Sequence, residues 1–296
     1  MSLDAFISYI ALEKNYSPHT VKAYARDIAE FMDYCGESHN LTEAREANYT
    51  IIRSWIIGLV ERGISNRSIN RKISSLKSFY KFLQRTGQVN NTPLAKHRAL
   101  KSEKTIQVPF SEIEMSKVLR AIEYEPDFGG LRDRLIIELL YTTGIRRAEL
   151  INLKRADIDI DRKLLKVVGK RNKERIVPLI STLVDSITAY LEKRNMQEHE
   201  VDQTYFLLTN NGHKLYETFV YRVINKYLSK VSSKVKKSPH MLRHTFATHL
   251  LNQGAELNTL KELLGHSSLA STQVYTHSSI AKLKEVHSAA HPRSKE

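Results

Sequence analysis

Apolar residues in the first third of the chain recur every three or four positions, which predicts helices throughout residues 1–97. The pair Ser17-Pro18 is typical of a helix start, because the serine side chain can cap the first turn and proline has no amide hydrogen to leave unpaired. Ser65 begins a longer predicted helix that ends at Gly87. Between its apolar positions, this helix carries the cations Arg67, Arg71, Lys72, Lys77 and Lys81. The pattern predicts a compact four-helix unit whose basic outer faces can contact phosphates.

The periodic pattern stops between Asn90 and Pro109, where two prolines and several charges replace the large apolar residues. We interpret residues 98–109 as an extended linker, with the domain boundary near residue 105. The chain is therefore expected to form two domains, a helical one over residues 1–97 and a second one over residues 110–296.

The second domain begins with Ser111 and Glu114, a capping box for a helix that extends through Ile122. A strongly apolar helix follows over residues 131–141. Residues 156–178 change to a period of two, which predicts a small antiparallel sheet with polar turns. Helices are expected again from Ser181 almost to the end of the chain, interrupted by a turn at residues 210–212. The predicted fold class is mainly α, with a small antiparallel β-sheet in the second domain.

The charge balance adds information about partners. The 46 basic and 32 acidic side chains leave a formal charge of +14, which favours a polyanionic partner such as DNA, RNA or an acidic membrane surface. Residues 1–105 hold 16 basic and 10 acidic side chains, and the rest of the chain holds 30 and 22. Because both halves are basic, we expect both to contact the polyanion, although a general contribution to solubility is the alternative.

Several classes of protein are disfavoured. No run approaches 18 apolar residues, and the N-terminus lacks the pattern of a signal peptide, so we expect a cytoplasmic protein without a membrane span. The single cysteine, Cys35, leaves no internal disulfide or thiolate metal cage and is interpreted as a buried structural thiol. The chain has no GxxxxGK[ST] loop, GxGxxG or HExxH motif, so ATP hydrolysis and dinucleotide chemistry are unpromising.

The second domain contains an ordered series of polar residues that can carry chemistry. In chain order they are Arg146, Lys170, His240, Arg243, His244, His266 and Tyr275. Each has an ordinary structural explanation when it is taken alone, and Tyr275 is one of 14 tyrosines. The spacing of His240 and His244 also suits a metal pair, but no third ligand is evident.

Taken together, these residues and their flanks resemble the tyrosine recombinase family. The matching segments are TGIRRAEL at residues 143–150, GKRNKER at 169–175, HMLRHTFATH at 240–249 and LGHSS at 264–268, with Tyr275 nine residues after His266. The resemblance extends from the Ser-Pro-x-Thr segment at residue 17 to the closing residues 291–293. Among its members, the chain looks most like the bacterial Xer recombinases of chromosome-dimer resolution.

The resemblance implies a role for each residue in cutting and rejoining DNA. Tyr275 would attack the DNA and form a 3′-phosphotyrosine, which keeps the bond energy without ATP. Arg146 and Arg243 would hold the oxygens of the scissile phosphate, and Lys170 would protonate the leaving 5′-hydroxyl. His240 would act as the base and His266 as a phosphate ligand.

Two further residues complete the implied site. Glu149, one turn after Arg146, would orient the arginine, and His244 would pack beside the site. Lys173 would contact the DNA backbone at most. No metal or other cofactor is expected, because the arginines supply the charge that a metal pair would bring.

The same resemblance implies an architecture. The two domains would form a C-shaped clamp around double-stranded DNA with inverted-repeat half-sites, and four protomers would exchange strands through a Holliday junction. A second related recombinase could share this tetramer, and a DNA translocase or accessory protein could activate it. The helix at residues 280–290, with Leu283 and Val286 on one face, would dock into a neighbouring protomer; packing on its own domain is the alternative.

Three rival functions stay open at this point. The chain could be an integrase or resolvase of a mobile element, because some of those enzymes are equally short. It could be a non-catalytic DNA-binding protein with the same fold, although none of Arg146, Lys170, Arg243 and Tyr275 has been lost. An RNA-binding or membrane-surface protein is disfavoured by the absence of aromatic RNA-binding strands and of a basic amphipathic anchor.

Overall fold

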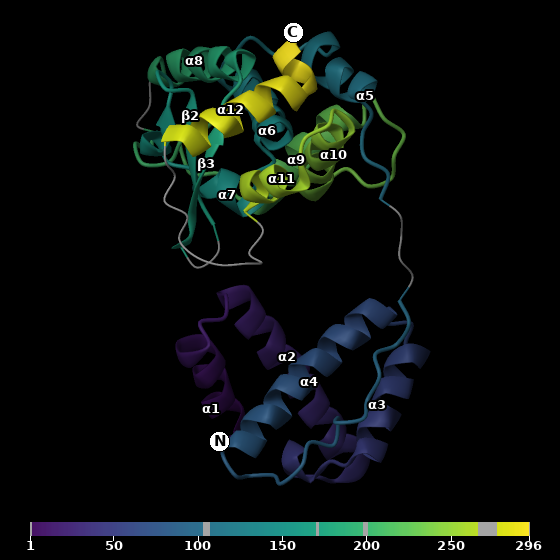
Figure 1. Cartoon of the computed structure of the whole chain (residues 1–296). Coiled ribbons are helices and arrows are strands. Elements are labelled where there is room, and N and C mark those ends of the chain that lie inside the picture. The colour runs from purple at the N-terminus through teal and green to yellow at the C-terminus, as the bar shows by residue number, and fades with distance from the viewer. Residues whose placement is uncertain (1, 103–106, 170–171, 198–200, 266–276, 296) are drawn as a thin grey trace. The chain divides into compact units, whose positions relative to one another are not determined.

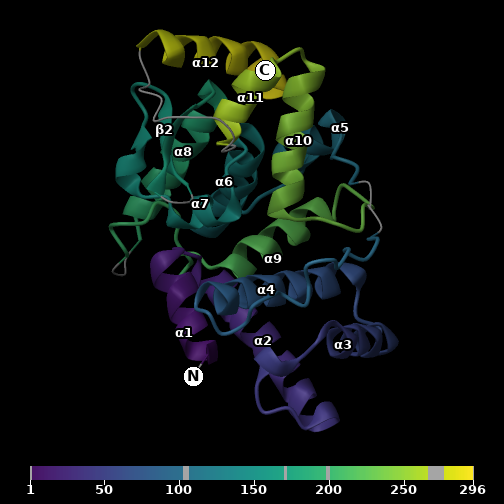
Figure 2. The ribbon, with the colours of Figure 1, turned by 60° about the horizontal axis from the view of Figure 1, so that its bottom comes forward.

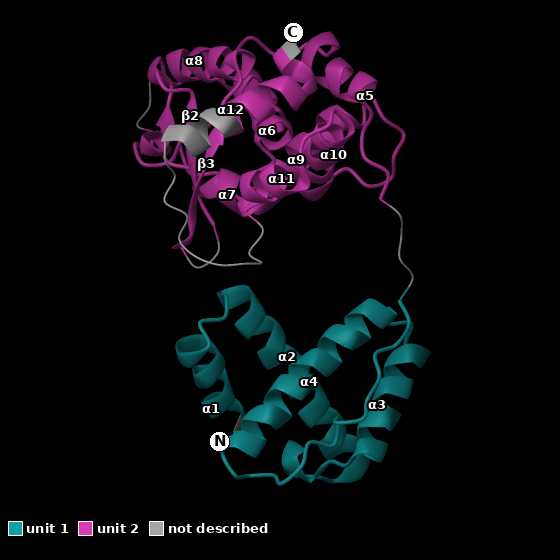
Figure 3. Cartoon of the chain, in the orientation of Figure 1, with its two compact units in different colours: residues 1–106 teal, residues 107–296 magenta. Residues whose placement is uncertain are grey.

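The structure is a computed structural model that describes residues 2–102, 107–169, 172–197, 201–265 and 277–295 (Figure 1). The chain divides into two compact units, residues 1–106 and residues 107–296 (Figure 3). Each unit has its own hydrophobic core and is described by itself. Among the helices of the described residues, none has the length and apolar content needed to cross a bilayer.

Unit 1 is helical, as the apolar periodicity predicts. Its elements are α1 (Ser2–Ser8) with a π-helical turn (Tyr9–Glu13), α2 (Pro18–His39), a 3-10 turn (Ala44–Glu46), α3 (Tyr49–Glu61) and α4 (Asn66–Arg85). The predicted caps are confirmed at Ser17 and Ser65, whose hydroxyls accept hydrogen bonds from the amides of Thr20 and Ser68 at 3.3 and 3.4 Å. Local sequence therefore determines where the helices of this unit begin.

The core of unit 1 is aromatic. Phe31 packs edge-on against Trp55, with 5.0 Å between the ring centroids, and both side chains are buried. Cys35 lies in the same core, and burial raises the pKa of its thiol to about 11. The prediction of a buried structural thiol is confirmed, since a thiol with this pKa is a poor nucleophile at neutral pH.

One cation of α4 does not lie on the outer face. Lys72 is only 7% exposed, and its ammonium pairs with Glu30 and lies 3.6 Å from a carboxylate oxygen of the fully buried Asp27. Arg71 pairs with the same Asp27. The expectation that Lys72 belongs to a phosphate-contacting face is therefore wrong, because a buried carboxylate needs a cation beside it. Arg67 remains exposed.

Unit 2 combines helices with a small sheet. Its elements are α5 (Glu112–Ser116) with a π-helical turn (Lys117–Ala121), α6 (Phe128–Thr143), α7 (Arg147–Asn152), a 3-10 turn (Arg155–Asp157), β1 (Ile158–Asp159), β2 (Leu164–Val168), β3 (Glu174–Pro178), α8 (Ser181–Asn195), α9 (Glu217–Leu228), α10 (Pro239–Asn252), α11 (Leu257–Leu264), α12 (His277–Ala290) and a 3-10 turn (Pro292–Lys295). The strands pair antiparallel in the order β1-β2-β3, as the period of two predicts. The capping box of Ser111 and Glu114 is also confirmed.

The helix α6 forms the centre of unit 2. Most of its side chains are buried, and it contacts α8, α9 and α10 (Figure 1). A helix that is apolar on nearly all sides needs neighbours on all sides, which explains why the other helices surround it.

Residues 201–216 differ from the sequence expectation. We expected helix on both sides of the 210–212 turn, but the structure places isolated β-bridges there, between Lys154 and Tyr205 and between Leu208 and Lys214. The buried Arg194 of α8 donates hydrogen bonds to the carbonyl oxygens of Tyr205 and Phe206 at 2.8 and 2.7 Å. Carbonyl oxygens of this segment thus accept hydrogen bonds from an arginine side chain, where a helix would have paired them with backbone amides.

The helix α12 packs on its own unit in this single chain. It contacts β3, α10 and α11 and lies along the upper side of unit 2 in Figure 2. Leu283, His287 and Ala290 are buried against the core, and Val286 is partly buried. Docking of this helix into a neighbouring protomer stays a prediction.

Candidate active site

The candidate site begins where α6 ends. Gly144 adopts a φ of +60°, and a Cβ atom added there would lie 2.3 Å from a ring carbon of Phe246. Only glycine combines this backbone conformation with so close an approach. Gly144 therefore ends α6 in a left-handed conformation, and Arg146 follows as the N-cap residue of α7.

Glu149 holds Arg146 in place. One oxygen of the Glu149 carboxylate accepts a hydrogen bond from the Arg146 amide at 2.8 Å. The other oxygen accepts a hydrogen bond from the Arg146 guanidinium, also at 2.8 Å. Glu149 is 7% exposed, whereas the side chain of Arg146 is 42% exposed. The carboxylate thus fixes the inner edge of the guanidinium and leaves other N–H groups free to face a ligand.

Arg243 enters the same place from α10. It is buried and donates hydrogen bonds to the carbonyl oxygens of Gly144 at 2.6 Å and Leu264 at 2.7 Å. Burial, together with the charges of Arg146 and Arg175, lowers the pKa of Arg243 to about 10. The group is still a cation at neutral pH, and its environment favours any anion that approaches it.

The sequence reasoning missed Arg175, which joins this cluster from β3. It is 5% exposed, and its two terminal nitrogens donate to the two carboxylate oxygens of Glu149 at 3.0 and 2.8 Å. Its Nε donates to the carbonyl oxygen of Leu263 at 2.8 Å. The period of two in this strand could have indicated that Arg175 points inward. Arg175 lies two residues before the buried Val177, and side chains two apart in a strand lie on the same face.

Three arginines meet at the C-terminal end of α11. Consecutive carbonyl oxygens of residues 263, 264 and 265 accept hydrogen bonds from Arg175 at 2.8 Å, Arg243 at 2.7 Å and Arg146 at 3.4 Å. The last carbonyls of a helix lack partners within the helix and carry a partial negative charge, so cations are stable there. The end of α11 therefore gathers residues from three other elements into one site.

The described site carries excess positive charge. Three guanidiniums surround a single carboxylate, Glu149. Burial alone would raise the pKa of Glu149, but the hydrogen bonds and charge of Arg175, with those of Arg146, outweigh burial and lower it. The carboxylate is thus ionised at neutral pH, and the remaining positive charge suits a phosphate group held by planar guanidiniums.

Two of the three histidines of α10, His240 and His244, lie near its start and have different surroundings. His240 is exposed near the start of the helix, and partial desolvation and the nearby cations Lys236 and Arg243 lower its pKa. It is therefore neutral, and able to accept a proton, at neutral pH. His244 donates from Nε2 to the carbonyl oxygen of Gln107 at 3.2 Å, so this ring nitrogen is already paired within the protein.

A metal site at this histidine pair finds no support. Within the described ranges, no group of three or more His, Cys, Asp and Glu side chains could hold a metal ion.

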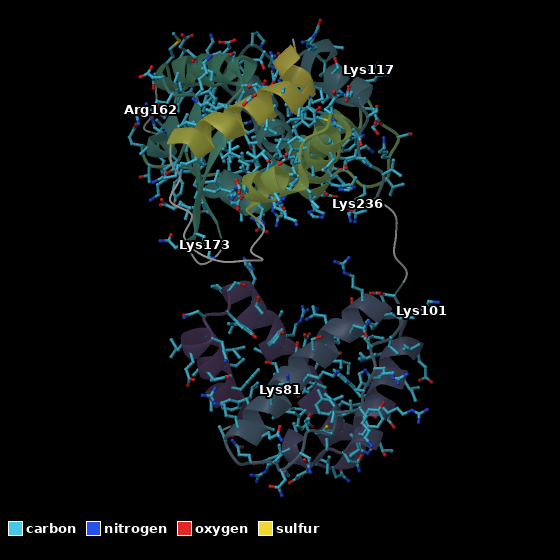
Figure 4. The ribbon with its side chains drawn as sticks, viewed as in Figure 1. Lys81, Lys101, Lys117, Arg162, Lys173 and Lys236 are labelled. Atoms are coloured by element: carbon cyan, nitrogen blue, oxygen red, sulfur yellow. The ribbon has the colours of Figure 1, made fainter. Side chains whose placement is uncertain are left out.

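Three of the predicted site residues, Lys170, His266 and Tyr275, lie outside the described residues. The described site reaches the neighbours of two of them, because Gly169 and Gly265 border it. Lys173 and Lys236 lie at the lower edge of unit 2 as drawn in Figure 4, on the side where Figure 1 labels α7 and α11. Cations therefore extend beyond the arginine cluster along this edge.

Comparison with known proteins gives the class. The model of the phage integrase family matches residues 109–282, and the model described as the N-terminal SAM-like domain of phage integrases matches residues 3–87. The chain therefore belongs to the phage integrase family.

The similar proteins define the class more closely. The chain is 38% identical to a protein named tyrosine recombinase XerC from Chlorobaculum parvum, over 98% of this chain and 94% of that protein. It is also 38% identical to a tyrosine recombinase XerC from Oceanobacillus iheyensis, over 99% and 96%. Accordingly, this protein is a tyrosine recombinase, an enzyme of site-specific recombination that acts on DNA.

A solved structure supports the fold. The XerH site-specific recombinase bound to a palindromic difH substrate matches with a TM-score of 0.71 and 21% identity, covering 93% of this chain and 81% of that one. The predicted fold class is confirmed.

Proposed function

We propose that this recombinase resolves chromosome dimers at a DNA site with inverted-repeat half-sites. The observation that carries the proposal is the convergence of Arg146, Arg175 and Arg243 on the end of α11, because such a cluster of guanidiniums suits a phosphate. The chromosomal role is supported by the near full-length similarity to proteins named XerC.

The proposed reaction starts with the phosphate in the arginine cluster. Arg146 and Arg243 hold its non-bridging oxygens, where negative charge grows as the phosphorus becomes five-coordinate. The phenol oxygen of Tyr275 attacks the phosphorus while His240 accepts the phenol proton. The bond to the 5′-oxygen breaks, and Lys170 donates a proton to that oxygen. A 3′-phosphotyrosine and a free 5′-hydroxyl result.

Rejoining reverses these steps with a different strand. The 5′-hydroxyl of the partner duplex attacks the phosphotyrosine and releases Tyr275, so the number of phosphodiester bonds is conserved. His266, by resemblance, binds the phosphate in both steps. The lowered pKa of His240 suits this scheme, because a neutral imidazole can accept the tyrosine proton near neutral pH.

The proposed assembly is a tetramer on two DNA sites. Both units of each protomer contact its half-site, which agrees with the basic character of both halves of the chain. A second related recombinase shares the tetramer, a DNA translocase or accessory protein activates it, and α12 docks into a neighbour.

A nicked duplex of the suspected site tests the chemistry. After incubation and denaturing electrophoresis, the wild type should give a covalent protein–DNA adduct, and Tyr275→Phe should give none. Tyr221→Phe is the matched control, because Tyr221 is 47% exposed and should leave the adduct unchanged. An adduct that persists in Tyr275→Phe would overturn the assignment of the nucleophile.

The proton donor needs a separate comparison. Lys170→Ala should bind DNA nearly normally while cleaving slowly, whereas Lys173→Ala, on the exposed part of the same hairpin, should cleave at a rate close to that of the wild type. If binding by Lys170→Ala falls as much as cleavage, Lys170 is a phosphate contact instead.

A genetic test addresses the biological role. Deletion of the gene should cause a chromosome segregation defect that disappears when homologous recombination is blocked, because crossovers create the dimers. A defect that is independent of homologous recombination would contradict the chromosomal role.

A further inference from the structure

We propose that Arg175 is a positioning residue for catalysis, because its ion pair with Glu149 sets the relative positions of the three segments that carry Arg146, Lys170 and His266. The inference rests on the proposed function of these residues.

The contacts of Arg175 reach all three segments. Arg175 lies on β3, one residue pair from the turn of the hairpin whose sequence contains Lys170. Its terminal nitrogens bind both oxygens of Glu149, which in turn holds the backbone and side chain of Arg146. Its Nε binds the carbonyl oxygen of Leu263 at the end of α11, close in sequence to His266. One rigid guanidinium thus links the hairpin, α7 and α11.

Two glycines bring the backbone directly onto this ion pair. A Cβ added to Gly169 would lie 3.3 Å from a carboxylate oxygen of Glu149. A Cβ added to Gly265, whose φ is +63°, would lie 3.1 Å from Cδ of Arg175. These glycines immediately precede Lys170 and His266 in the sequence, so the backbone that leads to each of the two residues packs against the ion pair.

Stability alone does not explain such a pair. Removing two charges from water costs several kcal/mol, and apolar residues of similar volume often replace a buried ion pair without loss of stability. The bidentate hydrogen bonds of the ion pair hold the guanidinium and the carboxylate in one plane and so fix their relative orientation. An apolar pair has no directional contacts and cannot do this. The pair therefore provides geometry to the site, and a displacement of about 1 Å at such a site can reduce a rate about 100-fold.

The first experiment measures the single-turnover rate of adduct formation, the DNA affinity and the thermal unfolding of purified variants. Arg175→Gln should reduce the cleavage rate about 100-fold. Its DNA affinity should change by less than about threefold, since many other phosphate contacts remain. Arg175→Lys should also cleave slowly, because an ammonium keeps the charge but cannot bind Leu263 and both oxygens of Glu149 together.

The pH dependence of cleavage separates positioning from general destabilisation. Without Arg175, the pKa of the buried Glu149 should rise, since Arg175 is the main group that lowers it against burial. The cleavage rate of Arg175→Gln should therefore fall further than that of the wild type between about pH 8 and pH 5, as Glu149 takes up a proton and releases Arg146. In the double variant Glu149→Gln/Arg175→Gln this additional acid limb should be absent.

A matched pair of glycine variants tests the packing independently. Gly265→Ala and Gly254→Ala both introduce a side chain at a positive φ, but Gly254 has open space where the methyl group would be placed. Both variants should lose some stability, and only Gly265→Ala should lose cleavage activity. In an Arg175→Gln background the Gly265→Ala change should have a smaller additional effect, because the two residues act through one contact.

The outcomes distinguish the two levels of the proposal. If the wild type forms no adduct, or Tyr275→Phe keeps it, the proposed function fails. If the wild type and its control behave as expected but Arg175→Gln cleaves as fast as the wild type, or without the additional acid limb, the role of Arg175 is refuted. Should Arg175→Gln not fold, the glycine pair decides, and equal cleavage by Gly265→Ala and Gly254→Ala would overturn the inference.

Discussion

Acid should destabilise unit 2 through three buried histidines. His249, His287 and His291 are at most 4% exposed, and burial is the main cause that lowers the pKa of each. Nε2 of His287 donates to the carbonyl oxygen of Thr142 at 2.8 Å, and the Tyr141 hydroxyl bonds to Nδ1 of His249 at 2.9 Å. The hydrogen bond to Thr142 raises the pKa of His287, but burial outweighs it, so the neutral imidazole is favoured there as it is at His249 and His291.

The cluster also contains a permanent charge. The pKa of His291 is lowered well below its ordinary value, first by burial and then by His287 and Arg293. Arg293 itself forms a buried ion pair with Glu138 of α6. A proton on His291 would therefore be placed in a site that already holds a cation.

The size of the effect follows from proton linkage. A histidine in the unfolded chain has a pKa of about 6.5, so unfolding at pH 5 takes up about one proton for each buried histidine. Above pH 6.5 the imidazole is neutral in both the folded and the unfolded state. Below this value proton uptake favours the unfolded state, so the free energy of unfolding decreases as the pH falls. From pH 7 to pH 5 the loss is at most about 2 kcal/mol per histidine, or about 6 kcal/mol for three, a large part of the 5–15 kcal/mol that is typical of a domain.

Acidic residues with lowered pKa values do not interfere in this range. The pKa of Glu114 is about 2, because hydrogen bonds and the charge of Lys234 outweigh the effect of burial, which acts in the opposite direction. The stability that Glu114 contributes is present above pH 4.5 and is lost only as the pH falls from there toward 2.

Urea unfolding at about pH 7 and pH 5 measures the effect, with the two units followed separately. The single tryptophan, Trp55, lies in the core of unit 1, so its fluorescence reports on that unit. Far-UV circular dichroism reports on both units. The circular dichroism component that belongs to unit 2 should move to lower urea at pH 5 by much more than the tryptophan transition does.

A pair of histidine variants tests the cause. His287→Gln should weaken the pH dependence of unit 2, whereas His213→Gln, at an exposed position, should leave it unchanged. The reasoning is refuted if both units lose the same free energy at pH 5, or if both variants keep the full pH dependence.

Two further perturbations follow from packing. Gly144→Ala should reduce the free energy of unfolding of unit 2 by about 2–5 kcal/mol in urea, because backbone strain at a positive φ adds to the overlap with Phe246; a loss below about 1 kcal/mol would contradict this packing. Lys72→Met should cost unit 1 about 3 kcal/mol by tryptophan fluorescence, since Asp27 loses a buried cation, while the DNA affinity of the folded protein stays unchanged. A weaker affinity without a loss of stability would instead make Lys72 a phosphate contact.

Much of the fold and part of the candidate site could be predicted from local sequence. Helix starts at Ser17, Ser65 and Ser111 depend on hydrogen bonds within one turn, so the sequence determined them. The period of two likewise indicated the sheet. Resemblance selected Arg146 and Arg243, and the structure brings their guanidiniums to adjacent carbonyls of α11.

The remaining features depend on contacts between residues far apart in the chain, and only the tertiary structure decided them. Arg175 stands at an inward position of a strand, but its meaning depends on Glu149, 26 residues away, and on the end of α11. In the sequence, Lys72 cannot be distinguished from the exposed cations of α4. Only the structure shows that it lies beside the buried Asp27 of α2. A charged side chain is stable inside a protein only with a partner, and local sequence does not say which partner folding will supply.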